Sequence, residues 1–375
     1  MQTPALKHDI PPVKQTMQNT LSSDLICRPE FMGGAPLLQP FVQNCASQRS
    51  MMASAHLTQS MVLDHAEQPR VMTGYEKIFG KYEFSTCRVA QGMTVCAEIP
   101  KFNPMTFHKI GIGKMPSRLI VYVGDDDKKV HCMEVSTYTM LSENFGYFNK
   151  LPGEEKGLLF AGSYIPKGTV LSTSPSHDGN RYAMGINANV AFMGEWGVTE
   201  DAFIVSRSLA EKGLNTAINQ VRLDIDPKTV PLNLYGDDTE HQCFPKIGAT
   251  VRYDGSLIGI RKVNPSTFVT DMTPDRLKVI ERIHDETHLA TPGSEIIDVE
   301  VFINEDAVRK MDSDKTLYQQ FFDIAECRKY QYDQILAVYE QLCIKDGYEC
   351  GDDFSTQVVR AAILSNNKKY VKKHT

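Results

Sequence analysis

Two short apolar runs on either side of an acid pair set the strongest condition on how this chain folds. Residues 185–206 are GINANVAFMGEWGVTEDAFIVS. The runs at 190–193 and 202–205 adjoin glycines and are typical of buried strands. Glu200 and Asp201 lie between them, where a buried carboxylate is costly unless cations, hydrogen-bond donors or a metal face it. We therefore expect a functional site at this pair.

Composition limits the class of protein. Of the 375 residues, 42% are apolar and 23% charged, which predicts two or three domains or one multi-lobed unit with a real core. A net charge of -6 argues against a strongly basic nucleic-acid binder and still allows a local basic surface. No apolar run approaches the ~20 residues of a membrane span, and residues 1–18 lack a secretory signal core. Nine cysteines without a CxxC pair predict free thiols in a reducing compartment.

Hydrophobic periodicity and turn residues predict the order of elements along the chain. Helices are expected at 47–62, 207–214, 274–288 and 306–344. Strands are expected at 82–89, 94–99, 119–123, 130–135, 220–225 and 294–302, a strand pair is expected around 250–262 with its turn at 254–255, and a strand–turn–strand element is expected at 164–171. A polar arm is expected at the N-terminal end of the sequence and a basic tail at residues 368–373.

Three polar patterns each allow a structural and a functional interpretation. Arg49, His56 and Gln59 form one stripe of the helix at 47–62, and a solvated helix face is the more general explanation. The acids at 125–127 are interpreted as a solvated hairpin turn. His284 and His288 have the spacing of two metal ligands on a helix, but the general base of that motif would be Glu where this chain has Asp285. An exposed helix end is therefore favoured over a metal site.

Six segments, in the same order and with similar gaps, resemble the second-largest (β) subunit of multisubunit DNA-directed RNA polymerases. They are residues 39–59, 71–76 (V-x-TG-x-E), 167–176, 184–206, 247–259 and 292–302. The sequence departs from the family pattern at Thr199, where the family has Phe, and at 55–58, where the family has Asn-Met-Gln-Arg. The loop before Glu200 is also one residue shorter. The family's N-terminal lobes and its later motif with paired lysines and a Gly-rich His-containing loop do not occur. The chain therefore resembles the middle piece of a split β subunit, as in giant bacteriophage polymerases.

The resemblance implies a mixed α/β, mostly β fold. It comprises part of a double-psi β-barrel core, a β-rich flap-like lobe and a helical C-terminal segment. The implied regions are an N-terminal arm at 1–30, the barrel-forming catalytic-core portion at 31–212, the flap-like lobe at 213–305, and the helical segment with the basic tail at 306–375.

The resemblance also implies nucleotidyl transfer, in which an RNA 3′-hydroxyl attacks the α-phosphate of a nucleoside triphosphate with two Mg²⁺ ions. Mg²⁺ would be held mainly by the largest subunit, so no residue here is a direct metal ligand. Glu200 and Asp201 would be the catalytic residues near the substrate-borne Mg²⁺, acting through water. Arg49 would face the triphosphate, because a planar guanidinium suits phosphate geometry, and Gln59 would support nucleotide or RNA contacts.

The implied partners are the largest (β′-like) subunit chains and separate chains that carry the N-terminal and C-terminal parts of β. The DNA template, the RNA product and nucleoside triphosphates are also implied partners, and no membrane is implied. The implied location is the cytoplasm of a bacterial host, with packaging in a virion left open. The alternative from another class is a non-catalytic scaffold or a truncated polymerase-like binding protein.

Overall fold

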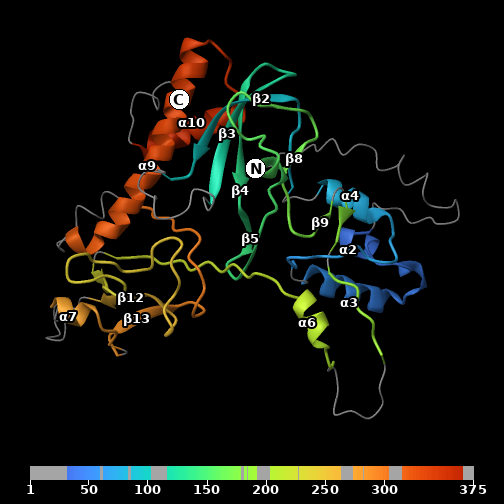
Figure 1. The fold of residues 1–375 in the computed structure, drawn as a ribbon, viewed down its shortest axis with the longest axis horizontal. Helices are drawn as coiled ribbons and strands as arrows, with labels where there is room; N and C mark the ends of the chain where they lie inside the picture. Colours follow the sequence, from blue (N-terminus) through green and yellow to red (C-terminus); the bar gives the residue numbers. More distant parts are fainter. Residues whose placement is uncertain are drawn as a thin grey trace, which may run out of the picture. The chain divides into compact units, whose positions relative to one another are not determined.

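In the computed structural model of this chain, the described residues contain antiparallel strands and α-helices, connected by turns and loops (Figure 1). The described residues are 32–59, 62–82, 86–102, 116–178, 181–183, 185–191, 203–226, 228–262, 273–281, 283–303 and 315–365. Contacts divide the chain into unit 1, residues 1–86 and 174–216, and unit 2, residues 87–173 and 217–375. The mixed, strand-rich composition agrees with the expected fold class, and the double-psi barrel stays a prediction.

Unit 1 is built from short helices and one two-stranded sheet. Its elements are α2 (Gly34–Leu37), η2 (Val42–Asn44), α3 (Ser47–Thr58), α4 (Tyr75–Tyr82), β9 (His177–Asp178), β10 (Arg181–Tyr182) and α6 (Arg207–Lys212). The predicted helices at 47–62 and 207–214 are confirmed in position. Ala183 is the only fully buried apolar residue in the described part of this unit, so polar contacts do much of the work of ordering it.

Unit 2 contains a four-stranded antiparallel sheet with both faces buried. Its strand order is β4-β3-β2-β7, formed by Val130–Ser136, Ser117–Gly124, Met93–Pro100 and Tyr164–Ile165. On β3, Ile120 faces one apolar cluster while Leu119 and Val121 face another, as strand alternation requires. A bulge after Val95 in β2 lets Ile99 face the opposite cluster from Val95. The predicted strands at 94–99, 119–123 and 130–135 are confirmed.

The strand–turn–strand element predicted at 164–171 forms, but its two strands belong to different sheets. Strand β7 pairs with β2, whereas β8 (Val170–Ser172) pairs with β1 (Cys87–Arg88). The turn between them contains Gly168 at φ +85°, and Arg88 donates a hydrogen bond to the Gly168 carbonyl at 3.0 Å. The pairing partners come from distant sequence, which turn residues alone do not reveal. Of the strand predicted at 82–89, Tyr82 is instead the last residue of α4, residues 83–85 lie outside the described residues, and Cys87–Arg88 form β1.

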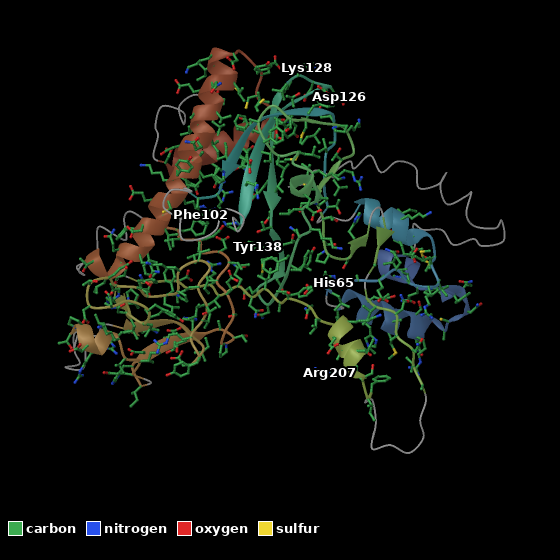
Figure 2. The ribbon with its side chains drawn as sticks, in the orientation of Figure 1. His65, Phe102, Asp126, Lys128, Tyr138 and Arg207 are labelled. Atoms are coloured by element: carbon green, nitrogen blue, oxygen red, sulfur yellow. The ribbon has the colours of Figure 1, made fainter. Side chains whose placement is uncertain are left out.

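The hairpin of β5 (Tyr138–Ser142) and β6 (Phe145–Phe148) and the short helix α5 (Pro152–Glu155) complete this part of unit 2. The acids at 125–127 form the turn between β3 and β4, as predicted. A polar cluster joins this region to residues 298–328. Lys101 pairs with Asp298 and, at 2.8 Å, with Glu300. Tyr138 donates to Asp298 at 2.7 Å (labelled in Figure 2), and Arg328 pairs with Glu300 at 3.2 Å.

A second antiparallel sheet, with strand order β11-β12-β13, forms a lobe of unit 2. Its strands are Thr229–Pro231, Ser256–Lys262 and Asp285–Leu289. The predicted helix at 274–288 is wrong: α7 ends at Leu277 after one turn from Pro274, and β13 follows. The physical reason is Arg261, whose Nε and NH2 groups each lie 2.7 Å from a carboxylate oxygen of Asp285, with both side chains at most 2% exposed.

This arrangement excludes the helical metal motif. His284 precedes the strand that contains His288, so the two do not share a helix face. In the described ranges, no group of three or more His, Cys, Asp or Glu side chains is placed to hold a metal. Of the strand pair predicted around 250–262, the second strand is confirmed as β12 from Ser256 onward, whereas residues 250–253 form no strand. No strand forms at 220–225 or 294–302, where only an isolated bridge joins Thr250 to Glu295.

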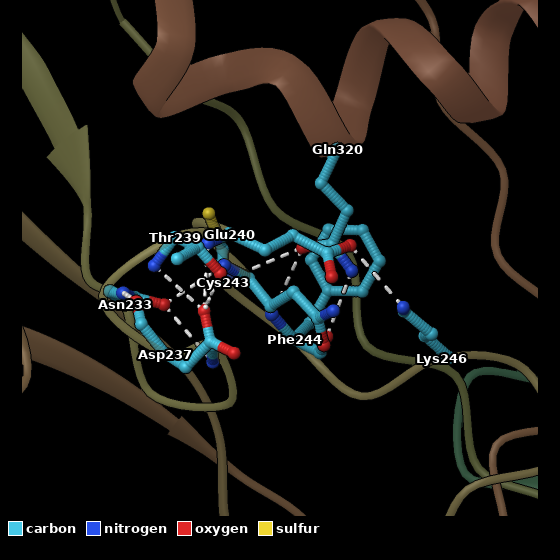
Figure 3. A network of polar contacts seen from close by, with 10 residues as sticks. Asn233, Asp237, Thr239, Glu240, Cys243, Phe244, Lys246 and Gln320 are labelled. Atoms are coloured by element: carbon cyan, nitrogen blue, oxygen red, sulfur yellow. Dashed lines mark hydrogen bonds and ion pairs between the residues drawn. The ribbon is translucent and has the colours of Figure 1, made fainter.

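One loop of this lobe is ordered by side chains that bond to backbone (Figure 3). Asn233 Oδ1 accepts from the backbone N–H groups of residues 236 and 242, at 3.0 and 2.9 Å. Asp237 accepts from the hydroxyl and N–H of Thr239 and from the N–H of Glu240, which lowers its pKa to about 2. Gln320 accepts from Cys243 N–H at 2.8 Å and so ties the loop to α9.

The helical segment after residue 314 packs inside unit 2. It comprises η4 (Lys315–Tyr318), α9 (Gln319–Tyr339), the π-helical turn η5 (Glu340–Lys345) and α10 (Asp352–Leu364). Phe321 packs with Phe244 of the lobe, while Ile335 and Phe354 pack on the four-stranded sheet. The helix predicted at 306–344 is therefore confirmed for its described part, which packs into the core of unit 2, whereas the sequence pattern predicted no separate helix at the position of α10. Among the helices in the described ranges, none is long and apolar enough to cross a bilayer.

His131 on β4 joins the β3–β4 turn to the start of α10. Its Nε2 lies 2.7 Å from Asp127 and its Nδ1 lies 2.8 Å from Asp353. Asp353 also accepts from the Cys132 N–H at 3.1 Å. Partial burial opposes the charged imidazolium, but the hydrogen bonds to the two carboxylates outweigh it and raise the pKa of His131 above 6.5. A Cβ at Gly351 would lie 2.6 Å from the imidazole ring, so only glycine fits there without displacing it.

Replacing Arg261 with Met removes one partner of the buried ion pair. Asp285 then keeps an uncompensated buried charge, and we expect a loss of about 3–5 kcal/mol in the free energy of unfolding, measured by urea denaturation of the full chain. Lys262→Met is the matched control, because Lys262 and Glu286 are the next residues on the same strands and pair at 3.4 Å on the surface. The control should change stability by less than about 0.5 kcal/mol. Equal losses in both variants would contradict the prediction.

The His131 contacts predict a pH-dependent stability. Because the folded-state pKa is raised, the stabilisation is fully present below pH 6.5 and is lost as pH rises through the folded-state value. We expect the free energy of unfolding of the wild type, relative to that of His131→Gln, to fall as the pH rises above 6.5. Urea denaturation at several pH values measures both. A difference between the two proteins that stays constant with pH would refute this role.

Candidate functional site

Helix α3 carries two of the predicted site residues and is braced by the turn before it. The amide of Gln39 donates to Ser54 Oγ at 2.9 Å and to the Ser50 carbonyl at 3.1 Å. Ser50 Oγ donates back to Gln39 Oε1 at 3.1 Å. Since no side chain caps the N-terminus of α3 at Ala46, these bonds are the polar contacts that fix its first half.

Arg49 and Gln59 are both exposed on this helix. In the described part of the chain, the one polar contact of the Arg49 guanidinium is the Met52 sulfur, at 4.0 Å. Gln59 follows the last turn of α3, and its backbone N–H bonds to the carbonyls of Ala55 and His56. The guanidinium and the amide are therefore accessible from solvent, as a substrate-facing group must be in the unassembled chain.

Glu200 and Asp201 lie in 192–202, outside the described residues. The described flanks contradict the expectation of buried strands at 190–193 and 202–205. Val190 is 65% exposed, and Phe203 and Ile204 are 81% and 77% exposed. No strand forms at 185–191 or 203–206, apart from an isolated bridge at Gly185. A strand needs a neighbouring strand to satisfy its backbone, and the described residues offer none to these flanks.

Both flanks of the acid pair are attached to the segment that follows α3. On the first side, Glu67 N–H donates to the Gly185 carbonyl at 2.7 Å, and Asn187 N–H donates to Glu67 Oε2 at 3.0 Å. On the second side, Lys212 Nζ donates to Glu67 Oε1 at 3.1 Å. The Asn187 N–H and the Lys212 ammonium lower the pKa of Glu67, in that order of importance among the favourable contacts.

Asp64 supports the second flank at a further point. Thr216 donates to Asp64 through its N–H at 3.2 Å and through its hydroxyl at 2.9 Å. Within the second flank, Ser206 is the N-cap of α6, and its Oγ accepts from Leu209 N–H at 3.3 Å. Residues 64–68, the helix with Arg49 and Gln59, and both flanks of Glu200 and Asp201 thus belong to one unit.

Glu67 and Asp64 were not identified from the sequence. Their partners lie about 120 to 150 positions away along the chain, and a lone acid in a polar segment has no periodic signal. The only local indication is their position shortly before the V-x-TG-x-E motif.

The V-x-TG-x-E motif has a physical explanation in the structure. Glu76, 3% exposed, accepts from Thr73 N–H at 3.0 Å and from Gly74 N–H at 2.8 Å. Gly74 has φ +88°, a conformation that favours glycine. The carboxylate thereby satisfies the backbone at the entrance to α4, as a capping acid does. The motif is therefore a helix start, which orders the residues directly after the Glu67 segment.

The geometry defines a mostly polar, helix-containing unit joined to a unit of antiparallel sheets, and comparison with known proteins adds a family likeness. No protein-family model matches the chain. The chain is 26% identical over 294 residues to the DNA-directed RNA polymerase subunit beta of Desulfosudis oleivorans, which covers 71% of this chain and 20% of that protein. It is 24% identical over 359 residues to the subunit of the same name from Syntrophobacter fumaroxidans, covering 90% of this chain and 24% of that one.

A third relative, from Corynebacterium urealyticum and also named DNA-directed RNA polymerase subunit beta, is 25% identical over 301 residues. The chain spans 20% to 24% of the length of these three proteins. The predicted resemblance to the β subunit is confirmed as a distant similarity over much of the chain. The assignment to a split subunit of a giant bacteriophage stays a prediction.

Replacing Glu76 with Gln should weaken the start of α4. An amide has one acceptor oxygen where the carboxylate has two, so one of the two backbone N–H groups loses its partner. We expect a loss of about 1–3 kcal/mol in local stability, measured as faster amide hydrogen exchange at Thr73 and Gly74. Lys77→Ala, at the next and exposed position, is the control and should leave both exchange rates within twofold or so. Unchanged exchange in Glu76→Gln would contradict the capping role.

Proposed function

We propose that this chain is part of the β subunit of a multisubunit DNA-directed RNA polymerase and contributes to nucleotidyl transfer in complex with other chains. The observation that carries the proposal is the identity of 24% to 26% over most of the chain to proteins named as that subunit. The grouping of α3 with both flanks of residues 192–202 in one unit supports it, because the proposed substrate-facing residues come from these two places.

The proposed roles follow the chemistry of each side chain. The exposed guanidinium of Arg49 binds the triphosphate by paired hydrogen bonds, and Gln59 contacts nucleotide or RNA. Glu200 and Asp201 accept hydrogen bonds from water around the substrate-borne metal. Mg²⁺, held mainly by the largest subunit, stabilises charge on the attacking and leaving oxygens.

The proposed partners are the largest (β′-like) subunit, chains that carry the remaining parts of β, and DNA, RNA and nucleoside triphosphates. Exposed apolar side chains in unit 1 support the need for partner chains. Phe203, Ile204 and Leu214 are between 65% and 81% exposed, and burying apolar surface contributes about 25 cal/mol per Å². We also propose that the chain is a split subunit of a bacteriophage polymerase that acts in the host cytoplasm, with or without virion packaging.

The second candidate function is a non-catalytic scaffold with a polymerase-like fold. The observation that favours it is the contrast between the units: the described apolar clusters all lie in unit 2, whereas Arg49 and both flanks of the acid pair belong to unit 1. A unit with its own apolar core, such as unit 2, can bind partner chains without contributing residues to catalysis.

Purification of the tagged chain from its native source separates the two functions. We expect other polymerase chains to co-purify and the assembly to synthesise RNA from a DNA template, nucleoside triphosphates and Mg²⁺. The isolated chain should synthesise none. Synthesis by the isolated chain would refute the split-subunit proposal. If the Glu200→Ala, Asp201→Ala double variant still co-purifies with the other polymerase chains and the assembly still synthesises RNA, the result would favour the scaffold.

Arg49→Ala tests the proposed contact with substrate. Loss of a charge-assisted hydrogen bond to phosphate should weaken substrate or transition-state binding by about 1.5–3 kcal/mol, or roughly 10-fold to 150-fold. The measurement is the rate of RNA elongation by the assembled enzyme at limiting nucleotide. Arg222→Ala is the control, because Arg222 is an exposed arginine of unit 2 whose side chain is 77% exposed. An unchanged elongation rate in Arg49→Ala would remove Arg49 from the site.

A further inference from the structure

One carboxylate holds both ends of the segment that contains Glu200 and Asp201. Glu67 Oε2 accepts from the N–H of Asn187 at 3.0 Å, before the segment, and Glu67 Oε1 accepts from Lys212 Nζ at 3.1 Å, after it. The two oxygens therefore serve different ends of residues 188–211. We call this arrangement the carboxylate clasp.

Neighbouring contacts restrict the first end further. The Asn187 side-chain amide donates to Glu67 Oε2 at 3.3 Å and to the Gln68 carbonyl at 2.8 Å, and Glu67 N–H donates to the Gly185 carbonyl at 2.7 Å. Backbone and side chain of Asn187 are thus both held by residues 67 and 68. This end of the segment has little freedom to rotate, because a planar amide bonded at two points keeps one orientation.

The clasp matters because unit 1 has little apolar packing to hold the segment, and Asp64, which accepts from Thr216, supports only its second end. Ala183 is the only fully buried apolar residue in the described part of unit 1, whereas the described apolar clusters all lie in unit 2. Val190 and Phe203, which lie inside the segment, are 65% and 81% exposed. Because the segment has little apolar packing, the hydrogen bonds at its two ends fix the positions of those ends within unit 1.

A glutamate is the residue type that this geometry needs. An ionised carboxylate offers two acceptor oxygens and a negative charge for Lys212. A glutamine would offer one acceptor and turn its NH₂ group toward either the Asn187 N–H or the Lys212 ammonium, which are both donors. The contacts with Asn187 and Lys212 lower the pKa of Glu67, so the group stays ionised at neutral pH.

We propose that Glu67 is a positioning residue for nucleotidyl transfer, which fixes the two ends of the segment carrying Glu200 and Asp201. The proposal rests on the proposed function, because it gives Glu67 a role through the acid pair. It assigns a role to a residue outside the set expected to touch substrate. Loss of the clasp should displace the acid pair relative to the substrate-borne Mg²⁺ and so change how the enzyme responds to Mg²⁺, rather than only the amount of active enzyme.

The first arm of the experiment measures the clasp in the full chain, without any assumption about activity. Amide hydrogen exchange at Asn187 should be at least about tenfold faster in Glu67→Ala than in the wild type, because that N–H loses its acceptor. Asp64→Asn is a control within the unit: it should accelerate exchange at Thr216 and leave Asn187 unchanged. Equal exchange at Asn187 in the wild type and Glu67→Ala would overturn the clasp.

The second arm measures RNA synthesis by the assembled enzyme as a function of Mg²⁺ concentration. For Glu67→Gln, which loses one of the two arms, and for Lys212→Met, which loses the Lys212 arm, we expect about a tenfold higher half-saturating Mg²⁺ concentration, as for residues that orient metal-associated groups. Combining Lys212→Met with Glu67→Ala should be no worse than Glu67→Ala alone, since Glu67→Ala already removes the contact with Lys212. Glu211→Ala is the matched control, because Glu211 pairs with Arg207 at 3.0 Å within α6 and should leave the Mg²⁺ response unchanged.

The outcomes separate this proposal from the proposed function. A wild-type assembly that synthesises no RNA overturns the proposed function and the positioning role with it, even if the exchange result holds. An active wild type whose Glu67→Gln and Lys212→Met variants keep the normal Mg²⁺ response overturns the positioning role alone. A lower rate with an unchanged Mg²⁺ response also overturns it, because that result indicates loss of folded enzyme.

Discussion

Both faces of the four-stranded sheet in unit 2 are buried, so each face needs apolar side chains packed against it. On one face these side chains come from α9 and α10, near the C-terminal end of the described residues. Leu119 and Val121 of β3 pack against Ile335 and Tyr339 of α9 and against Phe354 of α10. The other face is closed by residues of the sheet's own neighbourhood, such as Leu159 and Leu171. Residues 315–365 are therefore part of the core of unit 2, and α9 reaches from this sheet to Phe244 of the lobe. The described positions of the two sheets in unit 2 depend on this helix and on the Lys101, Asp298 and Glu300 ion cluster.

Unit 1 is organised by a different kind of force. Its described residues contain one fully buried apolar residue, and acidic side chains that accept backbone N–H groups do the ordering. Glu76 starts α4, Glu67 joins the two flanks of the acid pair, and Asp64 holds Thr216. Polar contacts of this kind contribute about 0.5–1.5 kcal/mol each when solvent competes, so they set geometry more than they supply stability. A unit of this type fits a protein that gains its remaining stability from partner chains, as the proposed polymerase assembly requires.

Local pattern predicted the elements whose stability is local, and missed those whose partners are distant. The strands around residues 95, 120 and 132 follow from alternation, and the helices at 47 and 207 follow from local periodicity and turn residues. Each was found in place, although no side chain caps the helix at 47. The predicted helix at 274–288 failed because Arg261 needs a buried counter-ion, and Asp285 reaches it from a strand. The same event removed the helical spacing of His284 and His288, which had already been judged to favour an exposed helix end over a metal site. The apolar runs around residues 185–206 were predicted to be buried, and their described ends are exposed because no neighbouring strand covers them. In the candidate site, Arg49 and Gln59 were placed on one helix from sequence, whereas Glu67 gave no signal because its partners are distant along the chain.

The sequence by itself determined the likeness to polymerase β subunits, since ordered motifs with similar gaps survive large divergence in the residues between them. It also determined the main strands and the positions of the helices at 47 and 207, because these elements depend on neighbours two to four residues apart. Only the tertiary structure decided which strands pair, where the helical segment packs, and which carboxylate joins the flanks of the acid pair. The physical reason is the same in each case. Hydrogen bonds and burial between segments that are distant in sequence depend on how the chain brings them together, and local periodicity does not specify which distant segments meet.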